Sequence, residues 1–204
     1  MFFKYNSWSD VNNFELILYP LHYEPESSLF YLSEFFSNQE AVIENISKCL
    51  KENQLLVVKE HPAQAGMLLT KRFQKLKKRN SQLIYFPSVI SSFEIIKKSQ
   101  LIITLTSHLG WEALILGKPV YVLGKMFYDT YPYVNHFESF EKLRDDIRSK
   151  NYIYPKQDAT IDFIAKIIEH SYKGIPFPSP ILYSKENIDN IVFAIEKELN
   201  LIDE

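Results

Sequence analysis

Short apolar segments alternate with amphipathic segments over the first 123 residues of the chain, and this alternation limits the possible folds most strongly. Five of the apolar segments have the length and composition of strands: 14–19, 54–59, 83–86, 101–106 and 119–123. Between them, apolar residues recur three or four positions apart, as in helices, at 38–51, 65–79, 91–99 and 109–116. Strands that are apolar on both faces and alternate with helices are typical of a parallel sheet covered on both sides. We therefore predict an α/β fold with a Rossmann-like parallel sheet flanked by helices.

The pattern changes after Gly124, where an aromatic loop at 126–137 follows the last predicted strand. Helices are predicted beyond it, at about 138–149, 161–172 and 185–201, so the C-terminal third is expected to be helical. A length of 204 residues suggests one large domain with an appendage. The expected organisation is an N-terminal extension at 1–13, a Rossmann-like domain at 14–176, and at 177–204 a linker and a helix that packs on the same domain.

Composition excludes several classes of protein. The 23 basic and 25 acidic residues nearly cancel, so no overall field would recruit nucleic acid. The single cysteine, Cys49, cannot form an intramolecular disulfide, and we interpret it as a small buried residue. The longest run without charge, 80–93, is shorter than the roughly 18 residues that span a membrane, and the N-terminus has no signal-peptide pattern. A cytoplasmic location is expected, at the inner face of the membrane if a partner holds the chain there.

Glycine is scarce, and this excludes common nucleotide-binding motifs. With five glycines in 204 residues, neither a dinucleotide fingerprint nor a P-loop can be written anywhere in the chain. No two aspartates stand two positions apart, and no histidine or cysteine pair has the spacing of a zinc site. We therefore expect no metal and no cofactor.

Polar residues gather in three loops that follow predicted strands: 20–27, 60–62 and 106–112. Ligands of open parallel sheets bind at the carboxyl ends of the strands, where the N–H groups of helix N-termini favour anions. Three of the five histidines, His22, His61 and His108, lie in these loops. The loops are therefore the predicted ligand site.

Two positions in these loops suit a phosphate group. Pro62 restricts the backbone beside His61, whose imidazole could donate to a phosphate oxygen, although a plain turn histidine explains the same dipeptide. Thr106 and Ser107 place two hydroxyls at the start of a predicted helix, which suits a phosphate and equally suits an N-cap.

Other candidates also have two readings. Glu112 could accept hydrogen bonds from both hydroxyls of a ribose while Gly110 lets the ligand approach the backbone, or Glu112 could be an acid that complements the helix dipole. We interpret the basic run at 71–79 as a solvated helix face; the alternative is a surface that contacts nucleic acid or lipid phosphate. We interpret the aromatic side chains of the loop at 126–137 as packing in the core; the alternative is that the loop forms a lid or a wall that stacks on a base.

Three blocks in order, YPLHYEPES, VVKEHP and LTSHLGWEALILGKPVYVLGKMFYD, resemble the capsule polysaccharide biosynthesis family. That family includes retaining transferases of 3-deoxy-D-manno-octulosonic acid (Kdo) that use CMP-Kdo. The resemblance covers residues 14–172. Its last block is also similar to the donor-binding half of GT-B glycosyltransferases in general, so the resemblance implies a GT-B donor-binding half.

The resemblance implies roles for single residues. His61 and Pro62 match the motif that binds the CMP phosphate, with Ser107 assisting at the phosphate and Glu112 at the ribose. The first block would lie at the edge of the cleft and face the sugar or the cytosine, and its acids Glu24 and Glu26 are the catalytic candidates. The complete predicted nucleotide-sugar site consists of His22, Glu60, His61, Pro62, Thr106, Ser107, His108, Gly110 and Glu112.

The chain departs from the family in length, because only 13 residues precede the first predicted strand. In the family, the acceptor domain comes first in sequence, so this chain is expected to bind a CMP-activated acidic sugar without transferring it unless an acceptor domain joins it. The expected partners are then a nucleotide sugar and, through that domain, a saccharide or glycolipid acceptor. The alternatives are a domain related to the UDP-sugar 2-epimerases and a non-catalytic scaffold or regulatory subunit of a polysaccharide synthesis complex.

Overall fold

The computed structural model describes residues 4–24, 31–33, 36–177 and 179–199. The chain divides into two compact units, Met1–Gln157 and Asp158–Glu204.

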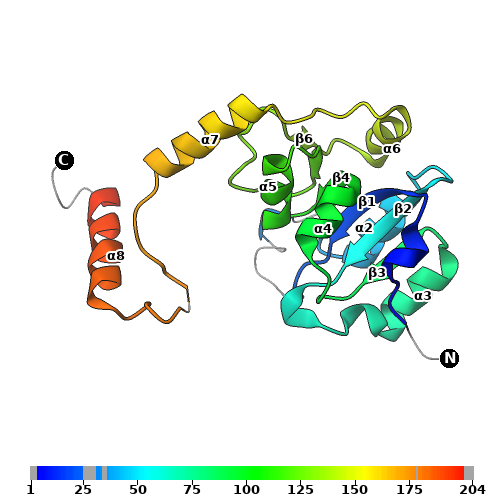
Figure 1. Cartoon of the computed structure of the whole chain (residues 1–204), viewed down its shortest axis with the longest axis horizontal. Coiled ribbons are helices and arrows are strands. Elements are labelled where there is room, and N and C mark those ends of the chain that lie inside the picture. Colours follow the sequence, from blue (N-terminus) through cyan, green and yellow to red (C-terminus); the bar gives the residue numbers. More distant parts are fainter. Residues whose placement is uncertain (1–3, 25–30, 34–35, 178, 200–204) are drawn as a thin grey trace. The chain divides into compact units, whose positions relative to one another are not determined.

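The first unit is built on one parallel sheet (Figure 1). Its strands are β1 (Glu15–Pro20), β2 (Gln54–Lys59), β3 (Leu83–Phe86), β4 (Ser99–Thr104), β5 (Val120–Val122) and β6 (Asn135–His136). They lie in the order β3-β2-β1-β4-β5-β6, and every pair of neighbours is parallel. β1 lies between β2 and β4, with Leu18 beside Val57 on one side and Ile102 on the other. The predicted Rossmann-like α/β fold is confirmed.

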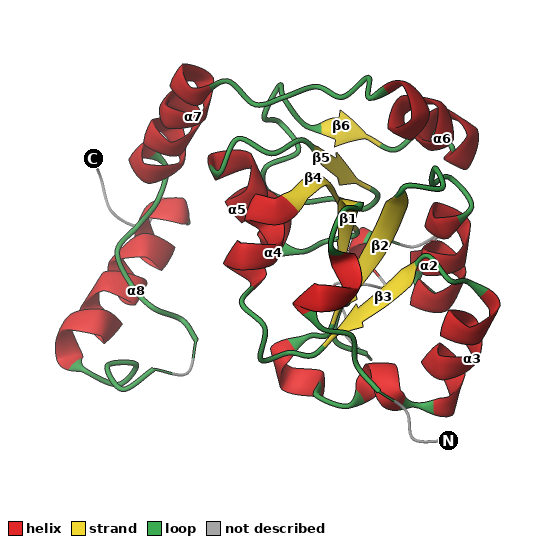
Figure 2. Ribbon diagram, turned by 45° about the vertical axis from the view of Figure 1, so that its right-hand side comes forward, coloured by secondary structure: helices red, strands yellow, loops and turns green. Residues whose placement is uncertain are grey.

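Helices cover both faces of this sheet (Figure 2). The helices are α2 (Gln39–Ser47), α3 (Lys71–Arg79), α4 (Ser92–Lys98), α5 (His108–Ile115) and α6 (Phe140–Ser149), with short 3-10 turns η1 (Trp8–Val11), η3 (Pro62–Gln64) and η4 (Met67–Leu69). Alternate strand residues, such as Ile17 and Tyr19, pack in one core with Ile43 of α2, Phe73 of α3 and Leu143 of α6. The remaining strand residues face α4 and α5, because successive side chains of a strand point to opposite faces.

Several elements differ from the prediction; for example, the helices predicted at 38–51 and 161–172 span 39–47 and 157–169. The predicted helix 65–79 begins only at Lys71, since Gly66 has a φ of 94° and this left-handed conformation cannot continue a helix. The fourth strand runs over 99–104 rather than 101–106. β6 was expected to be loop, and it forms because Asn135 is buried and its side-chain amide donates to the Val120 carbonyl oxygen at 3.1 Å.

The predicted N-terminal extension is packed on the sheet where it is described. Asn6 pairs with the edge strand β3: its backbone N–H donates to the Tyr85 carbonyl oxygen (2.8 Å), and its side-chain oxygen accepts from the Tyr85 N–H (3.0 Å). The Trp8 ring meets the Phe86 ring edge-on, with centroids 4.9 Å apart. This segment therefore protects part of an exposed sheet edge.

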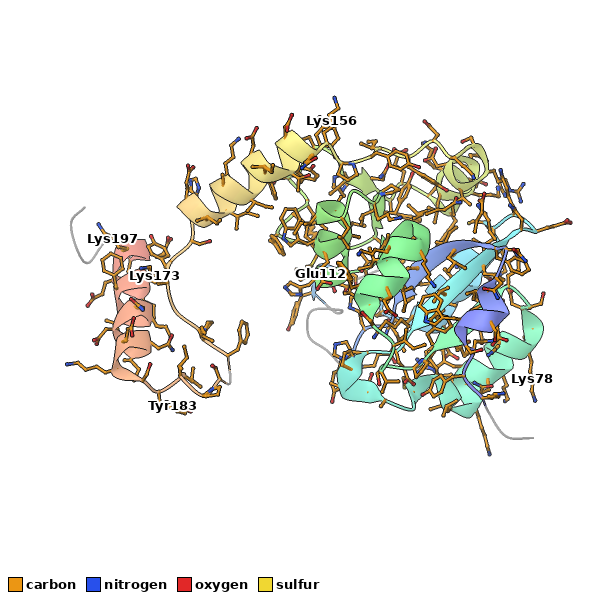
Figure 3. All side chains as sticks on the ribbon, in the orientation of Figure 1. Lys78, Glu112, Lys156, Lys173, Tyr183 and Lys197 are labelled. Carbon is orange, nitrogen blue, oxygen red and sulfur yellow. The ribbon has the colours of Figure 1, made fainter. Side chains whose placement is uncertain are left out.

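Helix α3 carries the basic run with its apolar side chains inside. Phe73 and Leu76 are buried in the core, which confirms the reading as a helix with a solvated basic face. Arg72 pairs with Glu24 (2.9 Å) and with Glu40 (2.8 Å), and Lys78 extends from the exposed side of α3 (Figure 3).

The second unit contains α7 (from Gln157 to Glu169) and α8 (Lys185–Glu198). Asn187 of α8 is buried and fastens the preceding linker: its side chain bonds both backbone groups of Ile175 (2.8 and 3.1 Å) and the Leu182 carbonyl oxygen (3.0 Å). The division at residue 157 comes before the predicted boundary at 176. The predicted packing of the last helix on the sheet domain stays a prediction.

Candidate functional site

A cavity of about 580 Å³ opens at the carboxyl ends of β1, β2 and β4. After β1 the chain builds β2 and β3 on one side of that strand, and it later returns to build β4 and β5 on the other side. Such a reversal of strand order creates a crevice in which ligands of open α/β sheets bind. The cavity is lined by Pro20, Leu21, His22, Leu32, Lys59, Glu60, His61, Pro62, Ser92, Thr106, Ser107, His108, Leu109, Lys125, Met126 and Phe127. The structure thus brings together seven of the nine residues of the predicted site.

His61 stands at the rim, where β2 ends and η3 begins. Its Nδ1 accepts a hydrogen bond from the Ala63 backbone N–H at 3.1 Å, and Pro62 occupies the first position of the turn. Because Nδ1 is the acceptor, the neutral ring carries its proton on Nε2. The turn therefore orients an imidazole N–H donor, which is the group needed to bind a phosphate oxygen.

His22 links the loop after β1 to the loop after β4. Its Nε2 accepts from the Thr106 backbone N–H at 3.3 Å, and Gln39 of α2 holds its backbone N–H (2.8 Å) and carbonyl oxygen (3.1 Å). Burial, with a smaller contribution from the charge of His61, lowers the pKa of His22 to about 4. His22 is therefore neutral near pH 7, which lets Nε2 accept while Nδ1 carries the proton.

The start of α5 lies against the same cavity. The Ser107 hydroxyl oxygen accepts from the Leu109 N–H at 3.1 Å, so Ser107 is the N-cap that one of its two readings expected. Thr104 holds the Ser107 backbone through a hydrogen bond of 3.2 Å from the Ser107 N–H to its hydroxyl oxygen. The first turn of α5 is thereby fixed with its N-terminus toward the cavity, where a helix favours anions.

The Thr106 hydroxyl is unusual among the described side chains, because it is buried and has no hydrogen-bond partner there. A buried hydroxyl without a partner costs about 1–3 kcal/mol, so it needs an explanation. Thr106 lines the cavity, so its hydroxyl is a candidate for a hydrogen bond to a ligand.

Lys59, which the sequence pattern does not distinguish, also lines the cavity. It is the last residue of β2, and its side chain is buried with 2% exposure. The ammonium donates to the carbonyl oxygens of Glu60 (3.1 Å) and Ser88 (3.3 Å). Burial lowers its pKa, and the nearby charge of Glu60 acts in the opposite direction. A lysine at the end of an apolar strand is usually solvated, so only the folded surroundings reveal this buried cation.

The carboxylate of Glu60 is engaged in internal bonds. Tyr5 donates its hydroxyl to this carboxylate at 2.7 Å, and the Leu68 backbone N–H donates to it at 2.9 Å. Burial and the Glu60 carboxylate raise the pKa of the Tyr5 hydroxyl. Glu60 thus fastens the N-terminal segment and η4 beneath the cavity, and its predicted contact with a ligand stays a prediction.

Gly110 and Glu112 do not line the cavity. A Cβ on Gly110 would lie 2.2 Å from the Tyr128 hydroxyl oxygen, so this position is occupied by an aromatic side chain where an approaching ligand was expected. Glu112 is exposed on α5 (Figure 3), and its predicted contact with a ribose stays a prediction.

The two catalytic candidates are Glu24 and Glu26. Glu24 accepts from Gln39 Nε2 at 2.7 Å and from Arg72 at 2.9 Å, so an ion pair holds its carboxylate. Glu26 lies outside the described residues.

The aromatic loop places some of its rings in the core and one ring in the wall of the cavity. Tyr128 and Tyr131 are fully buried, as the packing interpretation predicts. Phe127 is half exposed and lines the cavity beside His108, with ring centroids 6.0 Å apart. A flat apolar ring at a cavity mouth can stack on a nucleobase.

Two absences concern only the described part of the chain. Within it, no three His, Cys, Asp or Glu side chains are grouped so as to hold a metal ion. None of its helices is both long enough and apolar enough to cross a membrane.

Comparisons with known proteins identify a family for the chain and solved structures with a similar fold. The family model described as "Capsule polysaccharide biosynthesis protein" matches residues 6–139. No curated protein sequence matches the chain.

Solved structures share the fold over part of their length. "KpsC, beta Kdo 2,7 transferase" from Thermosulfurimonas dismutans is 26% identical, with 63% of this chain and 40% of that chain covered and a TM-score of 0.50. The "beta Kdo 2,4 transferase" of the same organism is 19% identical over 64% of this chain and 40% of that chain, with a TM-score of 0.47. TarM is 13% identical over 95% of this chain and 36% of that chain, with a TM-score of 0.50. The chain thus spans about 40% of the length of either Kdo transferase structure.

Proposed function

The chain belongs to the capsule polysaccharide biosynthesis protein family, and from this premise we propose that its sheet unit binds a nucleotide sugar as the donor-binding domain of a GT-B glycosyltransferase. The observation that carries the proposal is the convergence of His61, Thr106 and Ser107 from two strand ends on one cavity. The volume of about 580 Å³ lies within the range of small-molecule sites. His61 offers an oriented N–H and α5 offers its N-terminus, so both suit the phosphate of the donor.

The donor that we propose is a CMP-activated acidic sugar of the Kdo class. Support comes from the similarity of 26% to a structure named as a Kdo transferase, and from the strand-KEHP block that ends in His61 and Pro62. In this proposal Phe127 stacks on the base, and the His61 N–H and the N-terminus of α5 bind the phosphate without a metal. The acceptor saccharide or glycolipid would be bound by an acceptor domain, in the same protein or as a partner, since transfer needs both substrates held in reacting geometry.

The first prediction tests nucleotide binding. Titrations of CMP, CDP, UDP, GDP and ADP in a calorimeter are expected to show the tightest binding for CMP. His61→Ala is expected to weaken CMP binding roughly tenfold or more, because a charge-assisted hydrogen bond contributes about 1.5–3 kcal/mol. His170→Ala, at an exposed histidine of the second unit, is the matched control and should bind like the wild type.

Each other outcome has a defined meaning. A preference for UDP would favour the relation to UDP-sugar 2-epimerases over the proposed donor. A folded protein that binds none of the five nucleotides would contradict the proposal and favour a scaffold. Equal CMP affinity of wild type and His61→Ala would remove His61 from the phosphate site.

The second prediction concerns Glu112 and the ribose. If Glu112 accepts from the ribose hydroxyls, a 2′,3′-dideoxy CMP should bind more weakly to the wild type and lose almost nothing further in Glu112→Gln. Glu141→Gln, at the exposed first-turn acid of α6, is the control and should leave both affinities unchanged. Additive losses in the calorimetric cycle would assign Glu112 to the alternative role of an acid that complements the helix dipole.

A further inference from the structure

Lys59 is a buried cation with an unused hydrogen-bond donor. An ammonium has three N–H donors, and two of them reach the backbone carbonyl oxygens of Glu60 and Ser88. None of the ion pairs found among the described side chains includes Lys59. The charge of Glu60 acts on Lys59, but the Glu60 carboxylate is hydrogen-bonded to Tyr5 and to the Leu68 N–H and not to the Lys59 ammonium. Among the described residues the Lys59 ammonium therefore has no hydrogen-bonded carboxylate, and one of its three N–H donors is left for a ligand although the side chain is only 2% exposed.

A second, independent observation lies at the floor of the same cavity. The Thr106 hydroxyl is buried without a partner in the described structure, while its backbone N–H is bonded to His22. His22 is held neutral by burial, so it adds no positive charge that could replace that of Lys59. The β2 end contributes a cation and the β4 end a free hydroxyl, and both line the cavity on either side of β1.

We propose that Lys59 and the Thr106 hydroxyl together bind an anionic oxygen of the donor at the floor of the cavity. This inference rests on the proposed function and deepens it, because it assigns donor binding to Lys59, which precedes His61 in the same strand-KEHP block. The shared chemistry is an oxyanion, which a CMP-activated acidic sugar carries twice, as its phosphate and as the carboxylate of the sugar. Both groups would accept hydrogen bonds from an ammonium and from a hydroxyl.

The experiment compares three ligands that differ in their anions. Cytidine has none, CMP has the phosphate, and CMP-Kdo has the phosphate and the carboxylate. Their affinities are measured by calorimetry for the wild type, Lys59→Met and Thr106→Val. Lys118→Met is the matched control, because Lys118 also donates to two backbone carbonyl oxygens, those of Lys97 and Ser99, but lies outside this cavity.

The expected result is a loss of discrimination between ligands. If the phosphate is the bound group, Lys59→Met should lower the preference for CMP over cytidine about tenfold or more. If the carboxylate is bound, that preference stays and the preference for CMP-Kdo over CMP falls by the same factor. Lys118→Met should change neither ratio.

Thr106→Val keeps the proposal testable should Lys59→Met fail to fold. The substitution removes a buried hydroxyl without a partner and keeps the shape, so the melting temperature of the free protein should stay the same or rise. The ratio of affinities that Lys59→Met lowers should nevertheless also fall in Thr106→Val, by a smaller factor. A merely structural threonine would not combine unchanged stability with lost discrimination.

Two results would overturn the inference, and they are distinguishable. If the wild type binds CMP and CMP-Kdo but both ratios persist in Lys59→Met and Thr106→Val, the floor site is wrong and the proposed function stands. If the wild type binds neither CMP nor CMP-Kdo, both the proposed function and the floor site fail.

Discussion

Acidification from pH 7 to pH 4 is expected to lower the free energy of unfolding by about 3 kcal/mol through His22 alone. The pKa of His22 is about 4 in the folded protein and 6.5 in its ordinary state. The unfolded chain therefore binds a proton between these two values that the folded chain does not. The contribution of His22 to the free energy of unfolding is fully present above pH 6.5 and is lost as the pH falls toward 4. The cause of the lowered pKa is burial, with a smaller contribution from the charge of His61. Protonation of Nε2 would also break the hydrogen bond that it accepts from the Thr106 N–H.

Urea unfolding at pH 7, 5.5 and 4.5 measures this effect. Both tryptophans, Trp8 and Trp111, lie in the sheet unit, so their fluorescence reports its unfolding. His22→Gln should be less stable than the wild type at pH 7 but should lose less stability on acidification. His170→Gln, at an exposed site of the second unit, should show the same dependence of the unfolding free energy on pH as the wild type when tryptophan fluorescence is followed. If the free energy of unfolding fell with pH equally in the wild type and in His22→Gln, His22 would not be held neutral in the folded protein.

Gly110→Ala is expected to destabilise the sheet unit by about 1–3 kcal/mol, the usual cost of overpacking. The added Cβ would lie 2.2 Å from the Tyr128 hydroxyl oxygen, 3.0 Å from Tyr128 Cζ and 3.1 Å from Thr104 Cγ2. Tyr128 is fully buried and donates to the Ser107 carbonyl oxygen at 2.8 Å, so it has little room to move. The substitution should also weaken nucleotide binding, because Tyr128 and Thr104 hold the start of α5 in place.

A double-mutant cycle separates this clash from other effects. Tyr128→Phe alone should cost about 1 kcal/mol through the lost hydrogen bond. Combined with Gly110→Ala, it removes the oxygen nearest to the new Cβ, so the double variant should be more stable than the sum of the two losses implies. Additive losses in urea unfolding, or a neutral Gly110→Ala, would contradict this packing role.

The sheet could be predicted from the sequence because its strands are buried on both faces. A segment such as 55–58 is apolar along its whole length, and no other element of this chain needs that pattern. β6 could not be predicted, since Asn135 and His136 are polar and pair with β5 only through tertiary bonds. The late start of α3 depends on the backbone conformation of Gly66, which a helical periodicity does not reveal.

The candidate site was predictable in position but not in detail. Topology places the loops after β1, β2 and β4 at one edge, and this brought His22, His61 and Ser107 to one cavity. The engagement of Glu60 by Tyr5 joins residues 55 positions apart and follows from no local pattern. The burial of Lys59 likewise depends on the Ser88 carbonyl oxygen of a later loop.

The strand order also fixes when the sheet can be completed during synthesis. β1 is the central strand, yet its pairing with β4 joins Leu18 to Ile102, so the nascent chain must reach beyond residue 102 before β1 has both neighbours. Until then the apolar β1 has one unpaired edge, which other chains can bind. Contacts so distant in sequence close slowly, so refolding should be slow compared with that of a helical bundle of this size.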